Sequence, residues 1–248
     1  MLDNIQFRIL KWIAHDSPDY RGGCDHGGSS RLASLMGHEF FSRIAGKSIV
    51  DFGCGEGADA VEMSVGGARR VIGIDIREDV LQTARQRALH AGVQNTCVFA
   101  SSTDELADIV VSVDAFEHFE DPAEVLRIMS TLLRPDGEVL VSFGPPWYHP
   151  LGGHLFSVFP WAHLLFSEKA LIHWRSTFKT DGATRFREVA GGLNQMSIAR
   201  FERLISASSF QLASVELIPI RKLRPFHNRF TREFTTAVLR CRLVKRTY

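Results

Sequence analysis

The stretch Asp51-Phe-Gly53-Cys-Gly55-Glu-Gly57-Ala58 decides the fold class of this 248-residue chain. It begins within a short apolar run at 48–52 and precedes a segment with helical spacing. The stretch therefore marks a turn from a strand into a helix. Glycines at such a turn let the backbone fold tightly and bring free amide groups at the helix start close to a ligand. We predict a ligand-binding turn within a βαβ unit.

Strands and helices alternate on the C-terminal side of this turn. The apolar runs predict strands at 48–52, 70–75, 96–100, 108–113 and 138–143, and the helical spacing predicts helices at 80–91 and 122–133. Nearly continuous apolar strands are typical of a parallel sheet whose two faces are covered by helices. A further helix at 197–208 and two strands at 211–218 and 234–243 complete the predicted elements.

The glycine pattern alone leaves two ligand classes open. G-x-G-x-x-A also fits the dinucleotide fingerprint, and Asp75 follows at about the spacing of a ribose-binding acid. Asp51 favours another ligand, because a carboxylate two residues before Gly53 would repel a pyrophosphate and attract a cation. S-adenosylmethionine carries an ammonium and a sulfonium group and no phosphate. The two acids therefore favour S-adenosylmethionine over a dinucleotide.

Four ordered motifs resemble those of the class I S-adenosylmethionine-dependent methyltransferases, in particular the type 11-like group. They are Val50-Asp-Phe-Gly-Cys-Gly-Glu-Gly57, Gly73-Ile-Asp75-Ile, Asp108-Ile-Val-Val-Ser-Val-Asp-Ala-Phe-Glu-His-Phe-Glu-Asp-Pro122 and Leu133-Arg-Pro-Asp-Gly-Glu-Val-Leu-Val-Ser-Phe143. The resemblance covers about residues 46–143. It implies a doubly wound, seven-stranded, mostly parallel Rossmann-like α/β sheet with an antiparallel last strand and a lid inserted after the fifth strand.

The resemblance also implies which residues bind the cofactor. Asp51 and the two following glycines would line the methionine end, Asp75 would bind the ribose hydroxyls, and Ile76 would pack on the adenine. The family often has an acid after the third strand, where this chain has two serines, with Asp104 as an offset alternative. The expected cofactor-binding residues are Asp51, Gly53, Cys54, Gly55, Asp75, Ile76, Ser101, Ser102 and Asp114.

We divide the chain into four parts. Residues 1–45 form an N-terminal helical cap with an amphipathic first helix and a glycine-rich loop or flap at 16–30. Residues 46–143 form the Rossmann-like core, and residues 197–248 complete it. Residues 144–196 are rich in aromatics, glycine and histidine and are too long for an ordinary connection, so we expect a substrate lid.

A base is needed where an acceptor hydroxyl loses its proton, and histidine suits this role. His118 follows the fourth predicted strand, and His149 and His154 follow the fifth, so all three are candidate catalytic residues. His163 is expected in a core or interface. Asp114-Ala-Phe-Glu117-His118 also resembles the E-x-x-E-H metal pattern of some O-methyltransferases, but Glu-His is frequent at this position without a metal. We therefore predict no metal.

These motifs predict an S-adenosylmethionine-dependent methyltransferase that O-methylates a small or medium-sized hydroxylated metabolite. Two alternatives stay open: a metal-assisted O-methyltransferase acting on a nucleic-acid or sugar hydroxyl, and a non-catalytic S-adenosylmethionine-binding regulatory protein. The net charge of +1 gives no global reason to expect a nucleic-acid partner. The oligomeric state stays open as well.

Two further features of the sequence concern location and surface charge. Four separated cysteines without a C-x-x-C pair suggest neither a zinc site nor a disulfide framework, and they predict a reducing, cytoplasmic location. No apolar run is long enough to span a membrane. Residues 219–248 hold nine Lys or Arg against one acid, Glu233. We interpret this segment as a solvated edge, in preference to a phosphate-binding or anionic-lipid face.

Overall fold

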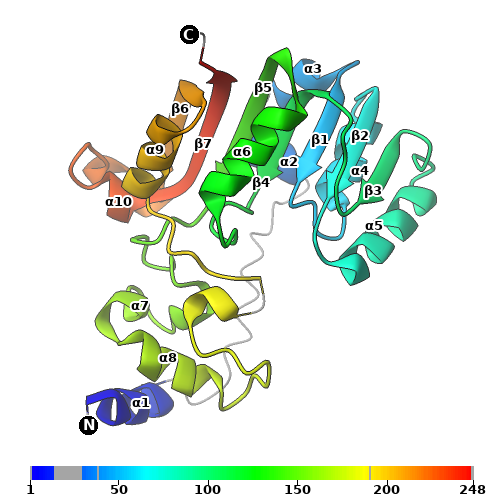
Figure 1. Ribbon diagram of the computed structural model, residues 1–248. Coiled ribbons are helices and arrows are strands. Elements are labelled where there is room, and N and C mark those ends of the chain that lie inside the picture. The colour runs from blue at the N-terminus through cyan, green and yellow to red at the C-terminus, as the bar shows by residue number, and fades with distance from the viewer. Residues whose placement is uncertain (1, 14–29, 38, 190, 247–248) are drawn as a thin grey trace.

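A seven-stranded sheet is the centre of the molecule. The computed structural model describes residues 2–13, 30–37, 39–189 and 191–246 (Figure 1). The strand order is β3-β2-β1-β4-β5-β7-β6, and β7 runs in the direction opposite to the other six strands. This arrangement confirms the predicted fold class. The strands are β1 Ser48–Phe52, β2 Arg70–Ile74, β3 Cys97–Ala100, β4 Ala107–Val113, β5 Leu133–Phe143, β6 Phe210–Pro219 and β7 Thr236–Lys245.

Helices cover both faces of the sheet, as the continuous apolar strands predict. One face packs against α6 (Pro122–Leu132) and α9 (Ile198–Ala207), through side chains such as Leu126 and Phe201. The other face packs against four helices: α2 Arg31–Met36, α3 Phe40–Ile44, α4 Ala58–Val65 and α5 Glu78–His90. Two buried cores, one on each face, therefore hold the strand ends in place.

The predicted boundaries differ from the structure in several elements, and the contacts of β5 and β7 explain two of these differences. β5 begins at Leu133, because this residue already pairs with Ala107 of β4. The last strand begins at Thr236 instead of 234, because α10 (Arg232–Thr235) precedes it. In α10, Glu233 accepts hydrogen bonds from the N–H groups of Ile198 and Ala199 at the start of α9. A contact distant in sequence therefore fixes this boundary.

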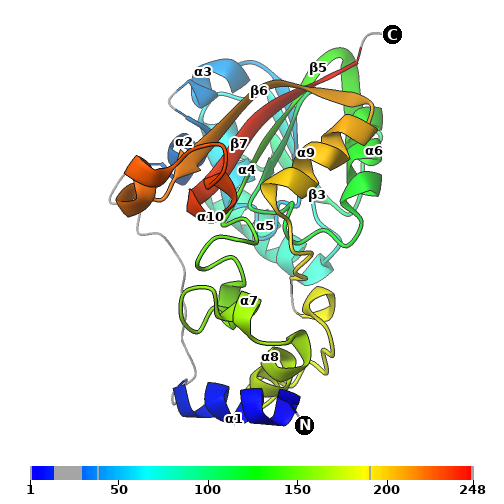
Figure 2. The same cartoon turned by 90° about the vertical axis from the view of Figure 1, so that its left-hand side faces the viewer.

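The N-terminal helix and the insertion fold together into a helical lobe, which we define as residues 144–196 with α1 (Leu2–Ile13). Its other elements are η1 (His154–Phe156), α7 (Ala162–Leu165), α8 (Glu168–Arg175) and η2 (Phe186–Glu188). The lobe has an apolar core of its own, which includes Leu10, Phe156, Trp174, Phe186 and Leu193. Figure 2 shows the lobe beyond the carboxyl edge of the sheet. Residues 144–196 therefore contain several short helices. Their closing as a lid stays a prediction.

The N-terminal segment 1–45 divides between the lobe and the sheet. Helix α1 packs on α8, where the Ser167 hydroxyl donates to Asp3 at 2.6 Å and Phe7 stacks on His173. Helices α2 and α3 instead bury Leu32 and Phe40 against the sheet. Of the predicted glycine-rich loop 16–30, only Ser30 belongs to the described residues. Among the helices of the described residues, none is long and apolar enough to cross a membrane.

Candidate active site

The turn between β1 and α4 has the backbone that its glycines predict. Gly53, Gly55 and Gly57 all have positive φ angles, of 83°, 51° and 76°. A Cβ atom on Gly53 would lie 2.9 Å from the Cβ of Ala115, so a side chain there would also collide with the loop after β4. The sequence therefore needs glycine at this turn for both conformation and space.

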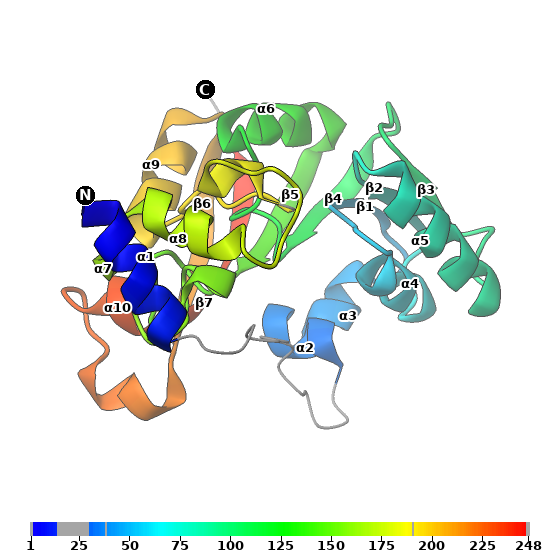
Figure 3. The ribbon, with the colours of Figure 1, turned by 90° about the horizontal axis from the view of Figure 1, so that it is seen from below.

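A cavity of about 610 Å³ opens beside this turn, at the carboxyl edge of the sheet. Its volume lies within the usual range for small-molecule sites. Viewed from below in Figure 3, the helical lobe lies on the β5-β7-β6 side, away from β3. The cavity is lined by the ends of β1, β2 and β4 and by the lobe's last residues; the polar lining comprises Asp75, Arg77, Ser101, Ser102, Thr103, Asp114, His118, Glu120 and Arg187.

Ile76 and Asp75 can contact different parts of one ligand. Ile76 lines the cavity and is 92% exposed, so its side chain is free to pack against a flat apolar group. The Asp75 carboxylate is buried beside the glycine turn and accepts a hydrogen bond from the Gly55 N–H at 3.0 Å. Arg77 covers it with its backbone N–H and its guanidinium, at 3.0 and 3.1 Å. Because Arg77 is half exposed, a ligand's hydroxyls can compete with it for Asp75.

Three carboxylates and one cation gather at the other end of the turn. Asp51 is 2% exposed, and its Oδ2 atom has no hydrogen-bond partner among the described residues. Burial, with Asp59 nearby, raises the pKa of Asp51 well above its usual range. The Arg31 guanidinium donates to Asp59 at 2.6 Å and to Asp114 at 2.5 Å. This end of the site is therefore suited to a ligand that brings a positive charge to Asp51.

Glu117, His118 and His154 converge next to the cavity. Their potential ligand atoms all lie within 4.8 Å of one another, and the two histidine rings are 5.3 Å apart. Glu117 Oε2 and His154 Nε2 are buried and have no partner in the described part of the chain. Burial raises the pKa of Glu117 to about 8 and lowers that of His154 to about 4. The cluster can move a proton or hold a divalent cation.

The remaining predicted residues lie outside the cavity lining. His149 Nδ1 accepts a hydrogen bond from the Leu151 N–H at 2.9 Å, which is a contact within the turn after β5. Cys54 packs against the core behind the glycine turn. His163 is buried in the lobe between Ser157 and the Trp147 carbonyl, in agreement with the core position expected for it. Asp104 is not part of the lining, whereas both serines before it are.

Asn194 and Arg31 are two site residues that the sequence reasoning missed. The Asn194 amide donates to the carbonyls of Phe116 and Phe119, both at 2.7 Å, and its backbone N–H donates to Glu117 O. It therefore fixes the loop that presents His118. Arg31 comes from α2, far from Asp114 in sequence. No local pattern marks either residue, because both act through contacts distant along the chain.

Comparisons with known proteins agree with this geometry. Residues 44–144 match the family model of a methyltransferase domain. A ubiquinone biosynthesis O-methyltransferase of Aeromonas salmonicida is 41% identical over 105 residues, which make up 40% of this chain and 44% of that protein. The match thus spans less than half the length of this relative.

Solved structures share the fold at lower identity. An S-adenosylmethionine-dependent methyltransferase from Mesorhizobium loti aligns with a TM-score of 0.58 and 20% identity, over 88% of this chain and 99% of that one. The cyclase SpnF aligns with a TM-score of 0.56 and 13% identity, over 88% of this chain and 80% of its own. Since one fold serves different catalysts, the reaction has to be argued from the site.

Proposed function

We propose that this chain methylates a hydroxyl group of a small aromatic acceptor, because residues 44–144 belong to the class I S-adenosylmethionine-dependent methyltransferases. One observation carries the proposal: Asp51, whose buried Oδ2 atom has no hydrogen-bond partner among the described residues, lies at the same glycine turn that holds Asp75. Two acids at one turn suit a ligand with a cationic group at one end and hydroxyls at the other. They do not suit a dinucleotide, whose pyrophosphate would face Asp51.

Each residue at or near the turn would contact a different part of the cofactor. Asp51 would accept the ammonium group at the methionine end, and the cationic Arg31 beside it would pair with the carboxylate. Asp75 would accept both ribose hydroxyls once Arg77 moves aside. Ile76 would cover one face of the adenine, with Ser101 or Ser102 near its edge. Every one of these residues except Asp51 and Arg31 lines the cavity.

In this proposal His118 would take the acceptor's proton. Its Nδ1 lies 2.8 Å from the Gly192 carbonyl, which can only accept, so Nδ1 carries the hydrogen and Nε2 keeps a free lone pair. S-adenosylmethionine supplies an electrophilic methyl group when bound. The acceptor oxygen would displace the sulfur from that methyl carbon, and the hydroxyl proton would pass to His118 Nε2. Asn194 would position this ring.

The acceptor class rests on two supports. The relative from Aeromonas salmonicida is named a ubiquinone biosynthesis O-methyltransferase, and we propose a phenolic acceptor for this chain. Phe52 and Phe119 line the cavity near His118 and pack edge to face, so a planar ring has aromatic neighbours there. The relatives' names lend no support to a nucleic-acid acceptor or to a regulatory protein without catalysis.

Calorimetry and a product assay test the proposal. The purified chain is expected to bind S-adenosylmethionine and S-adenosylhomocysteine, and to form S-adenosylhomocysteine when a catechol is added. NAD is the control ligand. Binding of NAD in place of both methionine derivatives would refute the cofactor assignment. Cofactor binding without turnover on a panel of catechols, monophenols and aliphatic alcohols would instead refute the O-methyltransferase assignment.

A metal-assisted reaction is the second candidate, because two buried polar atoms of the Glu117, His118 and His154 cluster have no partner in the part of the chain that the structure describes. A carboxylate and two imidazoles suit several divalent cations. A cation held there would lower the pKa of the acceptor hydroxyl, so no free base would be needed. Exhaustive EDTA treatment separates the two routes. Turnover that survives EDTA supports His118 as the base, and turnover lost to EDTA and restored by Mg²⁺ or Zn²⁺ supports the metal.

A further inference from the structure

Helix α1 presents an apolar stripe to solvent. At about 100° per residue, five of its apolar side chains fall within an arc of roughly 100°. All five are exposed, and Trp12, at 79%, is the most exposed of them. They are Leu2, Ile5, Ile9, Trp12 and Ile13. An isolated exposed leucine needs no explanation, but a continuous stripe along a whole helix indicates an interaction surface.

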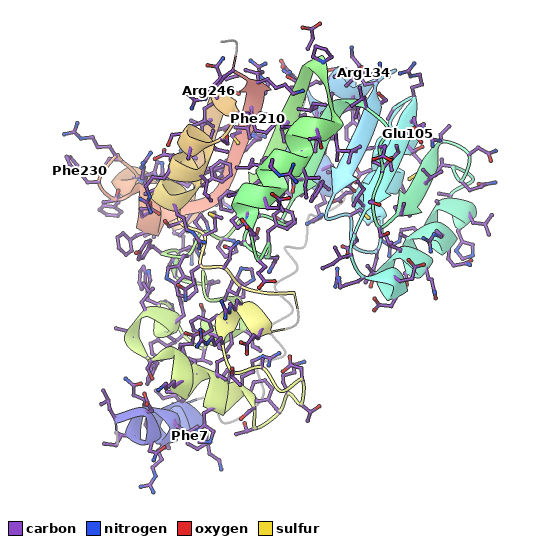
Figure 4. The ribbon with its side chains drawn as sticks, in the orientation of Figure 1. Phe7, Glu105, Arg134, Phe210, Phe230 and Arg246 are labelled. Carbon is purple, nitrogen blue, oxygen red and sulfur yellow. The ribbon has the colours of Figure 1, made fainter. Side chains whose placement is uncertain are left out.

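The stripe is separate from the face of α1 that holds the helix on the lobe. Leu10 is buried in the lobe core, and Phe7, labelled in Figure 4, stacks on His173 of α8. Gln6 accepts a hydrogen bond from the Ser167 N–H. Folding of the lobe therefore uses one side of α1 and leaves the apolar stripe free.

The charges around the stripe are positive. Arg8 borders the stripe, and Lys11 is exposed farther round the same helix. Asp3, the acid of this helix, points inward and accepts the hydroxyl hydrogen of Ser167. An amphipathic helix with a tryptophan on its apolar face and cations beside it is the usual form of a helix that lies in a membrane interface.

A second segment shows the same combination. The η3 loop, which we define as residues 221–230, exposes Phe226 and Phe230, the latter at 77%. It also exposes four cations that form no ion pair within the described residues: Arg221, Lys222, Arg224 and Arg229. The nearby acid Glu233 is again turned inward, toward the start of α9. In Figures 1 and 3 the η3 loop and α1 lie along the same side of the molecule, and Figure 4 shows Phe230 at its outer edge.

We propose that the apolar stripe of α1 and the η3 loop together dock the protein on an anionic phospholipid bilayer. Each segment offers apolar side chains for the acyl boundary and cations for the lipid phosphates, with its acid turned away. A second copy of the chain fits less well, because the same cations would face each other across a twofold interface. The basic C-terminal segment is then in part a lipid-binding surface instead of a solvated edge.

Vesicle co-sedimentation of the full chain tests this docking without cofactor or acceptor, so the result is independent of the proposed methyl transfer. The chain is expected to bind phosphatidylcholine vesicles that contain phosphatidylglycerol, and to be released by salt. The double variant Ile9→Ser/Trp12→Ser is expected to lower the partition coefficient by about tenfold or more. Val65→Ser, at an exposed apolar position on α4, is the matched control and is expected to change nothing.

The charge contribution is tested in the same assay. Arg224→Gln is expected to lower binding about fivefold, as expected for one cation near an anionic surface. Arg203→Gln, on the exposed side of α9, is its control. Equal binding of the double variant and the wild type would overturn the proposal, and so would equal binding to neutral and anionic vesicles. Concentration-dependent dimers in sedimentation velocity that Ile9→Ser/Trp12→Ser abolishes would assign the stripe to a second copy instead.

Discussion

The Nδ1 atom of His118 lies 2.8 Å from the carbonyl oxygen of Gly192, across the junction between the sheet and the lobe. The contact joins the loop after β4 to the last residues of the lobe. It sets the orientation of the ring and leaves Nε2 facing outward from the bond. The lobe therefore contributes to the site through its backbone as well as through its side chains.

His118→Gln removes the proposed base but keeps a side chain that can form the orienting hydrogen bond. The glutamine amide can still donate to Gly192, but it has no basic lone pair for a proton. We expect kcat to fall about 100- to 10,000-fold while the Kd for S-adenosylmethionine stays within about twofold. His90→Gln, on the exposed side of α5, is the control. Full turnover in His118→Gln would exclude this residue as the base.

Asn194→Ala should lower activity by displacing the loop that presents His118, since Asn194 itself transfers no proton. It removes the donor to two backbone carbonyls, so we expect a loss of about 1 to 3 kcal/mol in unfolding free energy. The variant should also lower kcat with little change in the Kd for S-adenosylmethionine. Urea denaturation and steady-state kinetics measure the two effects. A stability loss with unchanged kcat would mean that Asn194 supports the fold only.

Asp75→Asn should weaken cofactor binding, whereas Arg77→Ala should leave it equal or strengthen it. The loss of the charged acceptor for the ribose hydroxyls should weaken S-adenosylmethionine binding by about 1 to 3 kcal/mol. Arg77→Ala removes the side chain that competes for the same carboxylate, so binding should be equal or tighter. Titration calorimetry measures both. Weaker binding by Arg77→Ala would show that the guanidinium contacts the cofactor instead of competing with it.

Glu117→Gln should change the pH dependence of stability. Burial raises the pKa of Glu117 from 4.5 to about 8, so between these values the native chain holds a proton that the unfolded chain has released. The unfolding free energy therefore falls as pH rises through this window and levels off above it. Glu117→Gln removes this decline, while Asp51 contributes equally to both proteins. Parallel stability profiles of the two proteins between about pH 4 and about pH 9 would show that Glu117 is ionised in the native state.

Hydrogen exchange should locate the mobile part of the lobe. Helix α8 belongs to the packed core of the lobe, so its protection should not depend on ligand. Arg187, Gly191 and Gly192 line the cavity, and we expect this short stretch to gain protection when S-adenosylmethionine and an acceptor are bound together. Unchanged protection there in an active preparation would exclude a closing lid.

The sequence predicted the sheet because its signals are local. The apolar runs at 48–52 and 108–113 need only neighbouring residues to be recognised, and the glycine turn between β1 and α4 requires its glycines at fixed positions. Helix α10 was not predicted, because Glu233 holds it against α9 through a contact 35 residues away. The same reason applies to the ion pair of Arg31 with Asp114, which are 83 residues apart.

The helical lobe could not be predicted for a related reason. Its core combines Leu10 of α1 with Trp174 and Leu193 from the insertion. Neither segment contains enough apolar residues to form a core alone, so each looks incomplete when it is considered separately. The amphipathic pattern of α1 was visible in the sequence, but the pattern does not say which apolar residues face the protein.

The position of β7 between β5 and β6 has a consequence for synthesis on the ribosome. Residues 236–245 are translated after every other strand of the sheet, yet they pair with both neighbours. Until they emerge, β5 has an open hydrogen-bonding edge with Val141 and Phe143 on it, and such an edge invites pairing with other nascent chains. The cofactor-binding half can fold early, but the sheet is protected from aggregation only when its last strand inserts.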